Sequence, residues 1–212
     1  MNGGATIRRA ARFEGQRAGG CTRKPRGLLL LAALLAFSVW PAVPSARAQA
    51  AAPTEYQLKA AFLFNFAKFT DWPNEGFGSA QSPFLVCILG KDPFGRALDD
   101  MLQGKTIAEH PIVIERLRDA AGARRCQVVF VSKSESSRLA AIFQALRGSI
   151  ALLVGETDGF ARLGGAIELT LEEDRVGFII NPDAVGRARL RLSSKLLALA
   201  RIVHDDSSNG KS

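Results

Sequence analysis

The chain has 212 residues and a formal net charge of +8. Eight of its 28 basic residues, but only one of its 20 acidic residues, precede residue 49. The remaining 164 residues carry 20 basic and 19 acidic side chains. This balance excludes a nucleic-acid-binding protein that depends on a basic surface to hold phosphates, so no nucleic-acid partner is expected.

The N-terminal segment has the three zones of an export signal in the required order. A basic zone ends in Arg23, Lys24 and Arg26, an apolar run follows over 28–40, and small residues close the segment at 46–48. The apolar run has thirteen residues, whereas a spanning helix needs about 20. We therefore expect a removed signal peptide rather than an uncleaved anchor, and a mature protein outside the cytoplasm that does not insert into the membrane.

The expected domain organisation follows from this cleavage. Residues 1–48 form the signal peptide, and residues 49–212 form a single α/β domain with a core over about 54–204. A chain of this length suits one compact domain, and no linker or repeat divides it.

Cleavage also changes the cysteine count. Cys21 leaves with the signal peptide, while Cys87 and Cys126 remain. Two cysteines in an oxidising compartment usually pair, and this bridge would stabilise the fold by roughly 3–4 kcal/mol. The alternative is two buried free thiols. Two cysteines without a nearby histidine do not indicate a zinc site, so no metal is expected.

The first half of the mature chain predicts a helix followed by alternating strands and helices. Thr54 is expected to cap a helix to about Thr70, whose apolar residues are too dense for a surface helix. Pro73 breaks this helix because proline restricts the residue before it. The next expected elements are a strand over 84–89, a helix with Asp92 as cap and Pro93 at its first position that ends near Gln103, and a strand over 111–117.

The second half continues the alternation and then changes. The expected elements are a strand over 127–132, a helix from Ser134 to about Arg147, a strand over 150–154, hairpin strands over 166–171 and 176–181, a helix over 182–188, and a final amphipathic helix capped by Ser193. Strands that alternate with helices favour a parallel sheet. The predicted fold class is therefore an α/β sandwich, with a mostly parallel sheet, a C-terminal hairpin and flanking helices.

The residue types of a catalytic site are scarce. His110 and His204 are the two histidines, and neither has a nucleophile nearby in the sequence. The acidic run 172–174 is interpreted as a solvated hairpin turn rather than as catalytic carboxylates or a calcium site. The sequence therefore predicts no catalytic residue, no cofactor and no enzymatic activity.

Two glycine-containing loops remain candidates for ligand binding. Lys91 and Asp92 follow one predicted strand, and Glu156 and Asp158 follow another. Ligands in open α/β sheets gather at the carboxyl ends of the strands. These four residues are the candidate ligand loops, and ordinary tight turns are the alternative.

Several segments in order resemble one known family. They are Glu55–Phe69 with Asp71-Trp72-Pro73, Cys87–Gly95, Cys126–Phe130, Leu153–Glu156, Gly164-Gly165, Phe178–Asn181 and Leu192–Leu197. Together they resemble the YfiR family from about Glu55 to Val203, which is nearly all of the mature chain.

The resemblance implies a periplasmic protein without enzymatic activity that represses an inner-membrane diguanylate cyclase through the periplasmic sensor domain of the cyclase. It also implies release by a partner lipoprotein or by redox stress, dimer formation, and an α/β sandwich fold. Cys87 and Cys126 match a family cysteine pair, whereas a second pair found in some members has no counterpart here. A periplasmic small-molecule-binding protein that feeds a membrane signalling partner is the alternative.

A repressor of this kind needs a surface that binds its target. The helix and turn from Tyr56 to Trp72 are the expected surface, with Asn65, Lys68, Asp71 and Trp72 as the partner-binding residues. The alternative is that the aromatic side chains of this helix only fill the core.

Overall fold

A computed structural model describes residues 53–79, 81–173 and 175–205 of the chain. The expected signal peptide, residues 1–48, lies outside the described residues.

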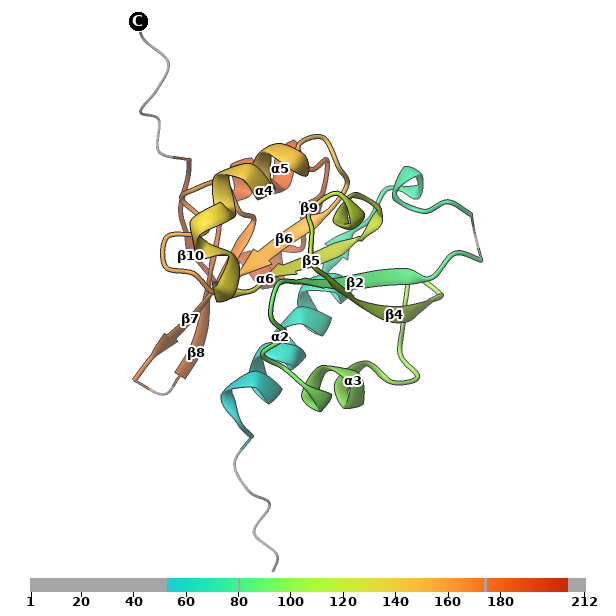
Figure 1. Ribbon diagram of the computed structural model, residues 1–212, viewed down its shortest axis with the longest axis horizontal. Coiled ribbons are helices and arrows are strands. Elements are labelled where there is room, and N and C mark those ends of the chain that lie inside the picture. The colour runs from blue at the N-terminus through green and yellow to red at the C-terminus, as the bar shows by residue number, and fades with distance from the viewer. Residues whose placement is uncertain (1–52, 80, 174, 206–212) are drawn as a thin grey trace, which may run out of the picture. The chain divides into compact units, whose positions relative to one another are not determined.

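The described elements alternate between strands and helices for most of the chain (Figure 1). In order they are α2 (Glu55–Lys68), β1 (Thr70–Asp71), a 3-10 helix (Asn74–Gly76), β2 (Phe84–Leu89), α3 (Arg96–Leu102), β3 (Thr106–Ile107), β4 (His110–Leu117), a 3-10 helix (Gly122–Arg125), β5 (Val128–Val131), a 3-10 helix (Lys133–Arg138), α4 (Leu139–Ala145), β6 (Leu152–Gly155), β7 (Ile167–Glu172), β8 (Arg175–Ile180), α5 (Pro182–Arg187), β9 (Arg191–Leu192), α6 (Ser194–Leu197) and β10 (Arg201–Ile202).

Eight of these strands form one sheet in the order β10-β8-β7-β6-β5-β2-β4-β3. The pairs from β4 through β2, β5 and β6 to β7 are all parallel, and so is the pair of β10 with β8. The β7–β8 hairpin and the short β3–β4 pair are antiparallel. The predicted α/β class with a mostly parallel sheet and a C-terminal hairpin is confirmed.

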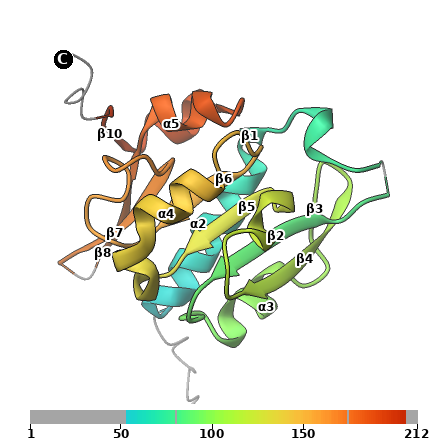
Figure 2. The ribbon, with the colours of Figure 1, turned by 45° about the horizontal axis from the view of Figure 1, so that its top comes forward.

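Helices cover both faces of the sheet (Figures 1 and 2). The central strands β2 and β5 are buried along their whole length, as their continuous apolar sequences predict. One core cluster joins this sheet to α2 and α3, and the second joins it to α4. The sandwich therefore has two separate apolar layers, with the sheet between them.

The first helix, α2, begins where the sequence predicts. Thr54 and Gln57 form a reciprocal capping box, in which the side-chain Oε1 of Gln57 accepts the Thr54 N–H at 2.7 Å. Its aromatic residues pack inward: Phe66 is fully buried and meets Phe178 of β8 at 5.1 Å between ring centroids. The aromatic density of the helix therefore serves the core to a large extent.

Two predicted helix starts are wrong, and side-chain contacts explain both. Asp92 accepts the Phe94 N–H at 2.7 Å in a turn, so α3 starts only at Arg96, after Gly95 at positive φ. Ser134 does not cap a helix, because its hydroxyl accepts the Lys91 N–H at 3.0 Å. Ser132 caps the 3-10 helix that precedes α4 instead.

The predicted final helix is also largely wrong. Ser193 does cap a helix, but α6 ends at Leu197, and the chain then adds β10 to the sheet beside Ile179 and Ile180 of β8. The Val203 N–H continues this pairing with a 2.9 Å bond to the Ile180 carbonyl. The edge of β8 offers backbone N–H and C=O groups with which this segment can pair. The apolar spacing of a helix does not prevent the same residues from pairing as a strand.

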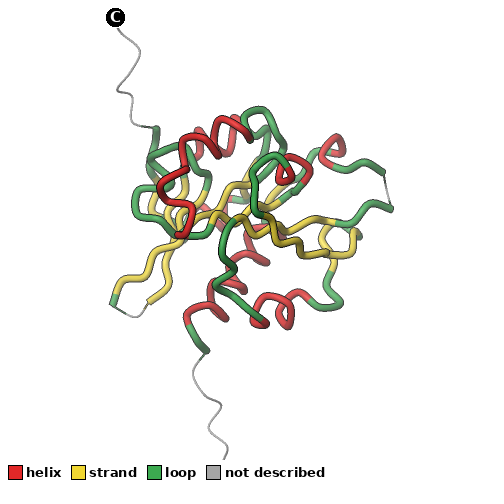
Figure 3. The backbone as a smooth tube through the Cα atoms, viewed as in Figure 1, coloured by secondary structure: helices red, strands yellow, loops and turns green. Residues whose placement is uncertain are grey.

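The β7–β8 hairpin extends beyond the neighbouring strands (Figure 3). Of the β7 residues, β6 pairs only with Ile167 and Glu168, while β10 pairs only with the last two residues of β8. The outer half of the hairpin is therefore not paired with β6 or β10. The open region between this half and the loop that follows β6 is called the corner below.

Candidate functional site

A buried ion pair joins the first turns of α2 to the loop after β6. Lys59 Nζ lies 2.7 Å from Glu156 Oε2, and each side chain is only 5% exposed. Lys59 also reaches Glu55 Oε1 on its own helix at 2.5 Å. Tyr56 donates its hydroxyl to Glu156 at 3.3 Å, and the Lys133 N–H approaches the other oxygen of Glu156 at 3.4 Å. Glu156 therefore accepts from three groups on two segments of the chain, α2 and the 3-10 helix that begins at Lys133.

The surroundings of this ion pair change the pKa of Lys59 and that of the neighbouring Tyr56. Burial lowers the pKa of Lys59, but hydrogen bonds to Glu156 and Glu55 outweigh burial, so the pKa lies above its ordinary value. Burial first, and the negative charge of Glu156 second, raise the pKa of Tyr56. At neutral pH the site therefore holds a charged lysine and a neutral tyrosine against the carboxylate.

A cavity of about 390 Å³ opens beside this pair, in the corner left by the protruding hairpin. Lys59, Glu156 and Asp158 line it together with Glu168 and Arg201. Glu168 is largely occupied, because its two oxygens accept the backbone N–H groups of residues 159 and 161 at 3.1 Å each. The lining is polar and carries both charges, so the corner suits a polar or zwitterionic ligand rather than an apolar one.

The structure separates the two predicted ligand loops. Glu156 and Asp158 both line this cavity, whereas Lys91 and Asp92 do not. Asp92 forms an ion pair with Arg116 at 2.8 Å, and the backbone N–H of Lys91 is bound to Ser134. Phe94, which follows these two residues, is 4% exposed and packs edge-on against Phe130.

The predicted partner-binding residues gather at the other end of α2. The Trp72 Nε1–H donates to the Ala67 carbonyl at 2.8 Å, and its ring packs edge-on against Phe84 at 5.0 Å. Lys68 and Asp71 are exposed beside it. The half-buried Asn65 lies one helical turn before them. Trp72 is thus fixed by the core, and the two charged residues beside it face the solvent.

Short strands stabilise this end of α2. The pairing of Thr70 with Leu192 and of Asp71 with Arg191 forms a two-stranded sheet of β1 and β9. The Arg191 guanidinium approaches the Asp71 carboxylate at 3.9 Å, with both side chains at least 80% exposed. The three residues Lys68, Asp71 and Arg191 therefore present mixed charge on a rigid backbone.

The comparison with protein families assigns the fold to a known group. A family model described as YfiR/HmsC-like matches residues 56–201, which is more than half of the chain and nearly all of its described part. The chain belongs to the YfiR/HmsC-like family. This membership supports a periplasmic regulator of cyclic di-GMP signalling in general terms, in a family of regulatory rather than catalytic domains.

One solved structure shares the α/β fold of this chain at low sequence identity, and this likeness adds no function. A conserved domain protein from Vibrio cholerae O1 biovar El Tor is similar at a TM-score of 0.50 and 10% identity, over 70% of this chain and 60% of that chain. This chain therefore spans less than two thirds of that protein. An ABC domain in complex with L-Trp from Streptococcus pneumonia reaches a TM-score of 0.42 at 8% identity, over 56% of this chain and 55% of that chain, which is too low to carry an argument. The comparison with curated proteins found no match.

The predicted disulfide of this YfiR/HmsC-like domain is present. Cys87 of β2 and Cys126, just before β5, are bonded, with 6.1 Å between their Cα atoms. Both cysteines are at most 1% exposed. The bond therefore lies inside the core layer under α4. Among the described residues, no helix is both long and apolar enough to cross a membrane.

Sequence reasoning missed the residues that complete the polar corner. Lys59 and Tyr56 were assigned only to the apolar helix, and Arg201 to a helix that the structure replaces with β10. One signal was available, because a lysine between Leu58 and Ala60 in an apolar helix needs a partner if the helix is buried. Which acid supplies that partner depends on the tertiary fold.

Proposed function

We propose that this YfiR/HmsC-like protein represses an inner-membrane diguanylate cyclase, or a similar sensor protein, by direct contact in the periplasm. The supporting observation is the family match over 56–201, which covers the whole sandwich. The proposed partner is the periplasmic domain of the cyclase. An outer-membrane lipoprotein that releases the repression and a second copy of this chain are further proposed partners.

The end of α2 is the proposed contact surface. Trp72 is held by its bond to the Ala67 carbonyl, and the backbone of Asp71 is held by its pairing with Arg191. A surface that is rigid before binding loses little conformational entropy when the partner arrives. Lys68 and Asp71 supply one charge of each sign, so they favour a partner with the complementary arrangement.

Repression by this route is a shift of population between two states of the cyclase. The repressor must bind the inactive state more tightly than the active one, and the difference in affinity sets the extent of repression. A shift from 1:99 to 99:1 needs a difference of about 5.5 kcal/mol. A few charged and aromatic contacts at the centre of an interface are sufficient for this.

Deletion of the gene tests the proposal directly. Cellular cyclic di-GMP should rise in the deletion strain and return to the starting level when the gene is restored. An unchanged cyclic di-GMP level would contradict repression of a cyclase.

Surface variants test the assignment of the contact. Lys68→Glu and Asp71→Lys should each raise cyclic di-GMP toward the deletion level, with the protein still present in the periplasm at normal abundance. Arg118→Glu is the matched control, because Arg118 is an exposed cation after β4, far in the sequence from this surface. Equal effects of the control and the α2 variants would remove the contact surface.

The polar corner favours a second candidate function, in which a small polar molecule binds the protein and modulates its partner. The observation behind it is the 390 Å³ cavity lined by Glu156 and Asp158. Native mass spectrometry of protein taken from its own periplasm should then show an added mass, which the Asp158→Arg variant loses. The polypeptide mass alone in both samples would contradict this candidate.

A further inference from the structure

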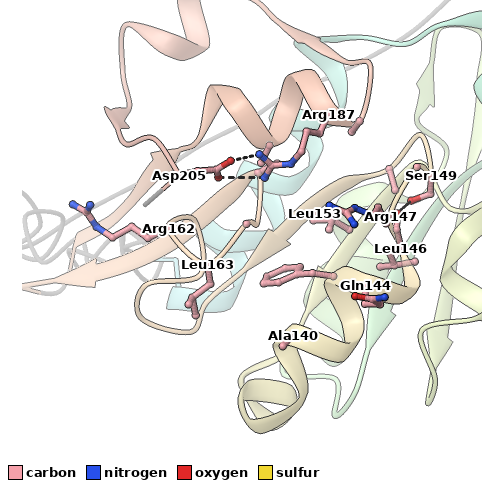
Figure 4. Close-up of a pocket in the computed structure, with 17 residues that line it drawn as sticks. Ala140, Gln144, Leu146, Arg147, Ser149, Leu153, Arg162, Leu163, Arg187 and Asp205 are labelled. Carbon is pink, nitrogen blue, oxygen red and sulfur yellow. Dashed lines mark hydrogen bonds and ion pairs between the residues drawn. The ribbon is translucent and has the colours of Figure 1, made fainter. Parts of the chain in front are cut away.

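A larger cavity of about 760 Å³ lies between α4, β6 and α5 (Figure 4). No residue lines both this cavity and the polar corner at Glu156. Its volume is within the range of small-molecule sites, which is about 300–1,000 Å³. Its lining combines an apolar part with arginine side chains.

The apolar part comes from three side chains on three segments. Phe143 of α4, Leu153 of β6 and Leu163 border the cavity. Phe143 is held edge-on against the buried Phe160 at 5.3 Å. Leu163 is 60% exposed, which is high for a leucine. An apolar ligand body would remove these side chains from water.

The basic part lies next to the apolar part. Arg147 and Arg187 border the cavity, and Figure 4 shows Arg187 turned toward Asp205, while Arg162 is directed away from the other labelled residues. A Cβ built on Gly164 would lie 3.8 Å from both Arg187 Nη2 and Phe143 Cδ2. The guanidinium group of Arg187 and the ring of Phe143 thus border the same glycine.

The charge of Arg147 is not used elsewhere in the described part of the chain. The carbonyls at the end of α4 have other donors: Arg124 donates to Ala145 and to the Arg147 carbonyl, and the Ser149 hydroxyl donates to Leu146 at 2.6 Å. The Arg147 guanidinium itself makes no hydrogen bond or ion pair with any described residue. It is therefore available to a ligand.

We propose that this cavity binds an amphipathic organic anion. The anionic head is held by the Arg147 and Arg187 guanidinium groups, which match the planar geometry of carboxylates and the oxygen atoms of sulfonates. The apolar body packs against Phe143, Leu153 and Leu163. Arg187 already donates from both terminal nitrogens to the Asp205 carboxylate, which also lines the cavity, so Arg147 supplies the larger share of head-group recognition. This site is independent of the proposed contact surface at the end of α2.

A fluorescent probe tests the proposal. The purified protein should bind 8-anilinonaphthalene-1-sulfonate at one saturable site. Decanoate and 2-naphthoate should both displace the probe, and their relative affinities distinguish a straight-chain from an aromatic body. Decyltrimethylammonium, which has the same tail length with a cationic head, should not displace it at the same concentration.

Charge-reversal variants locate the site. Arg147→Glu should weaken probe binding by about tenfold or more, since a charge-assisted hydrogen bond is replaced by repulsion. Arg191→Glu is the matched control, because its 87% exposed side chain lies outside the cavity lining, and it should bind as the unmodified protein does. Leu163→Asp should also weaken probe binding, because it removes an apolar contact with the body of the probe. Each variant is checked for an unchanged melting temperature by circular dichroism.

Three outcomes would overturn the proposal. They are the absence of saturable binding, displacement by the cationic amphiphile as strong as by decanoate, and equal binding by the folded Arg147→Glu and Arg191→Glu variants.

Discussion

Lys59 and Glu156 are 97 residues apart in the sequence, yet they form a 2.7 Å ion pair in which both side chains are 95% buried. The pair links α2, which carries the proposed contact surface at its other end, to the loop that follows β6. Taking two charges out of water is costly, and mutual attraction with further hydrogen bonds offsets that cost. Here the further bonds come from Tyr56 and Glu55.

Replacing one member of the ion pair should therefore lower the free energy of unfolding more than replacing both. Lys59→Met leaves Glu156 buried beside Glu55 without a cation, and we expect the free energy of unfolding to fall by about 3 kcal/mol or more. The double variant Lys59→Met with Glu156→Leu should recover much of this loss. Urea denaturation of the single and double variants measures both values.

Lys68→Met is the matched control for this experiment, because it changes the same residue type at an exposed position of the same helix. Its effect should be within about 0.5 kcal/mol. A Lys59→Met variant as stable as this control would show that the buried pair contributes nothing to the fold.

Alkaline pH should weaken the same contact. The pKa of Lys59 is raised above 10.5 in the folded protein, so its stabilising contribution is complete below the unfolded value and is lost as the pH rises through the folded value. The raised pKa of Tyr56 acts in the same direction from its ordinary value of 10.0. The free energy of unfolding should therefore decrease above about pH 10.

Comparison with Lys59→Met isolates the lysine. The variant lacks the titrating group, so the decrease in its unfolding free energy from about pH 10 to pH 12 should be smaller than in the unmodified protein. An equal decrease in the unfolding free energy of the two proteins over this pH range, measured by urea denaturation, would contradict this assignment.

The sequence predicted best where one local feature decides the structure. The run Phe84–Leu89 is apolar throughout, and it forms a strand buried on both faces with the predicted bounds. Thr54 is predicted as the cap of the first helix, and α2 begins directly after it, at Glu55. In both cases the neighbours along the chain determine the outcome.

The sequence predicted least where distant partners decide. The Ser134 hydroxyl could cap a helix, but it binds the Lys91 N–H across 43 residues. The segment after Leu197 has an apolar pattern compatible with a helix, but it pairs with the edge of β8 as strand β10. For the same reason, the sequence predicts Glu156 as a candidate but not its partners Lys59 and Tyr56.

Loss of the buried disulfide should lower stability substantially. The bond between Cys87 and Cys126 closes a loop with a sequence separation of 39, for which the expected contribution is roughly 3–4 kcal/mol. The double variant Cys87→Ala with Cys126→Ala should melt roughly 10 °C lower, since 1 kcal/mol corresponds to about 2–4 °C for a domain of this size. Differential scanning calorimetry measures the shift.

Reductant alone is a weaker test, because both sulfur atoms lie in the core and are reached only when the protein opens. The unmodified protein should therefore resist mild reductant at low temperature and melt like the double variant once it is unfolded and refolded under reducing conditions. Equal melting temperatures of the oxidised protein and the double variant would show that the bond adds no stability.

Phe160 makes two glycines indispensable. This fully buried ring lies so close to Gly155 and Gly165 that an added Cβ would stand 2.5 Å and 2.1 Å, respectively, from its atoms. Gly165→Ala should therefore destabilise the protein by about 1–3 kcal/mol or more, since overpacking forces a buried ring or the backbone to move. Gly186→Ala is the matched control, because Gly186 lies inside α5 with open space around it and should gain up to about 1 kcal/mol from helix propensity. Thermal denaturation of both variants checks the pair. A Gly165→Ala variant as stable as Gly186→Ala would contradict the close packing of Phe160 on Gly165.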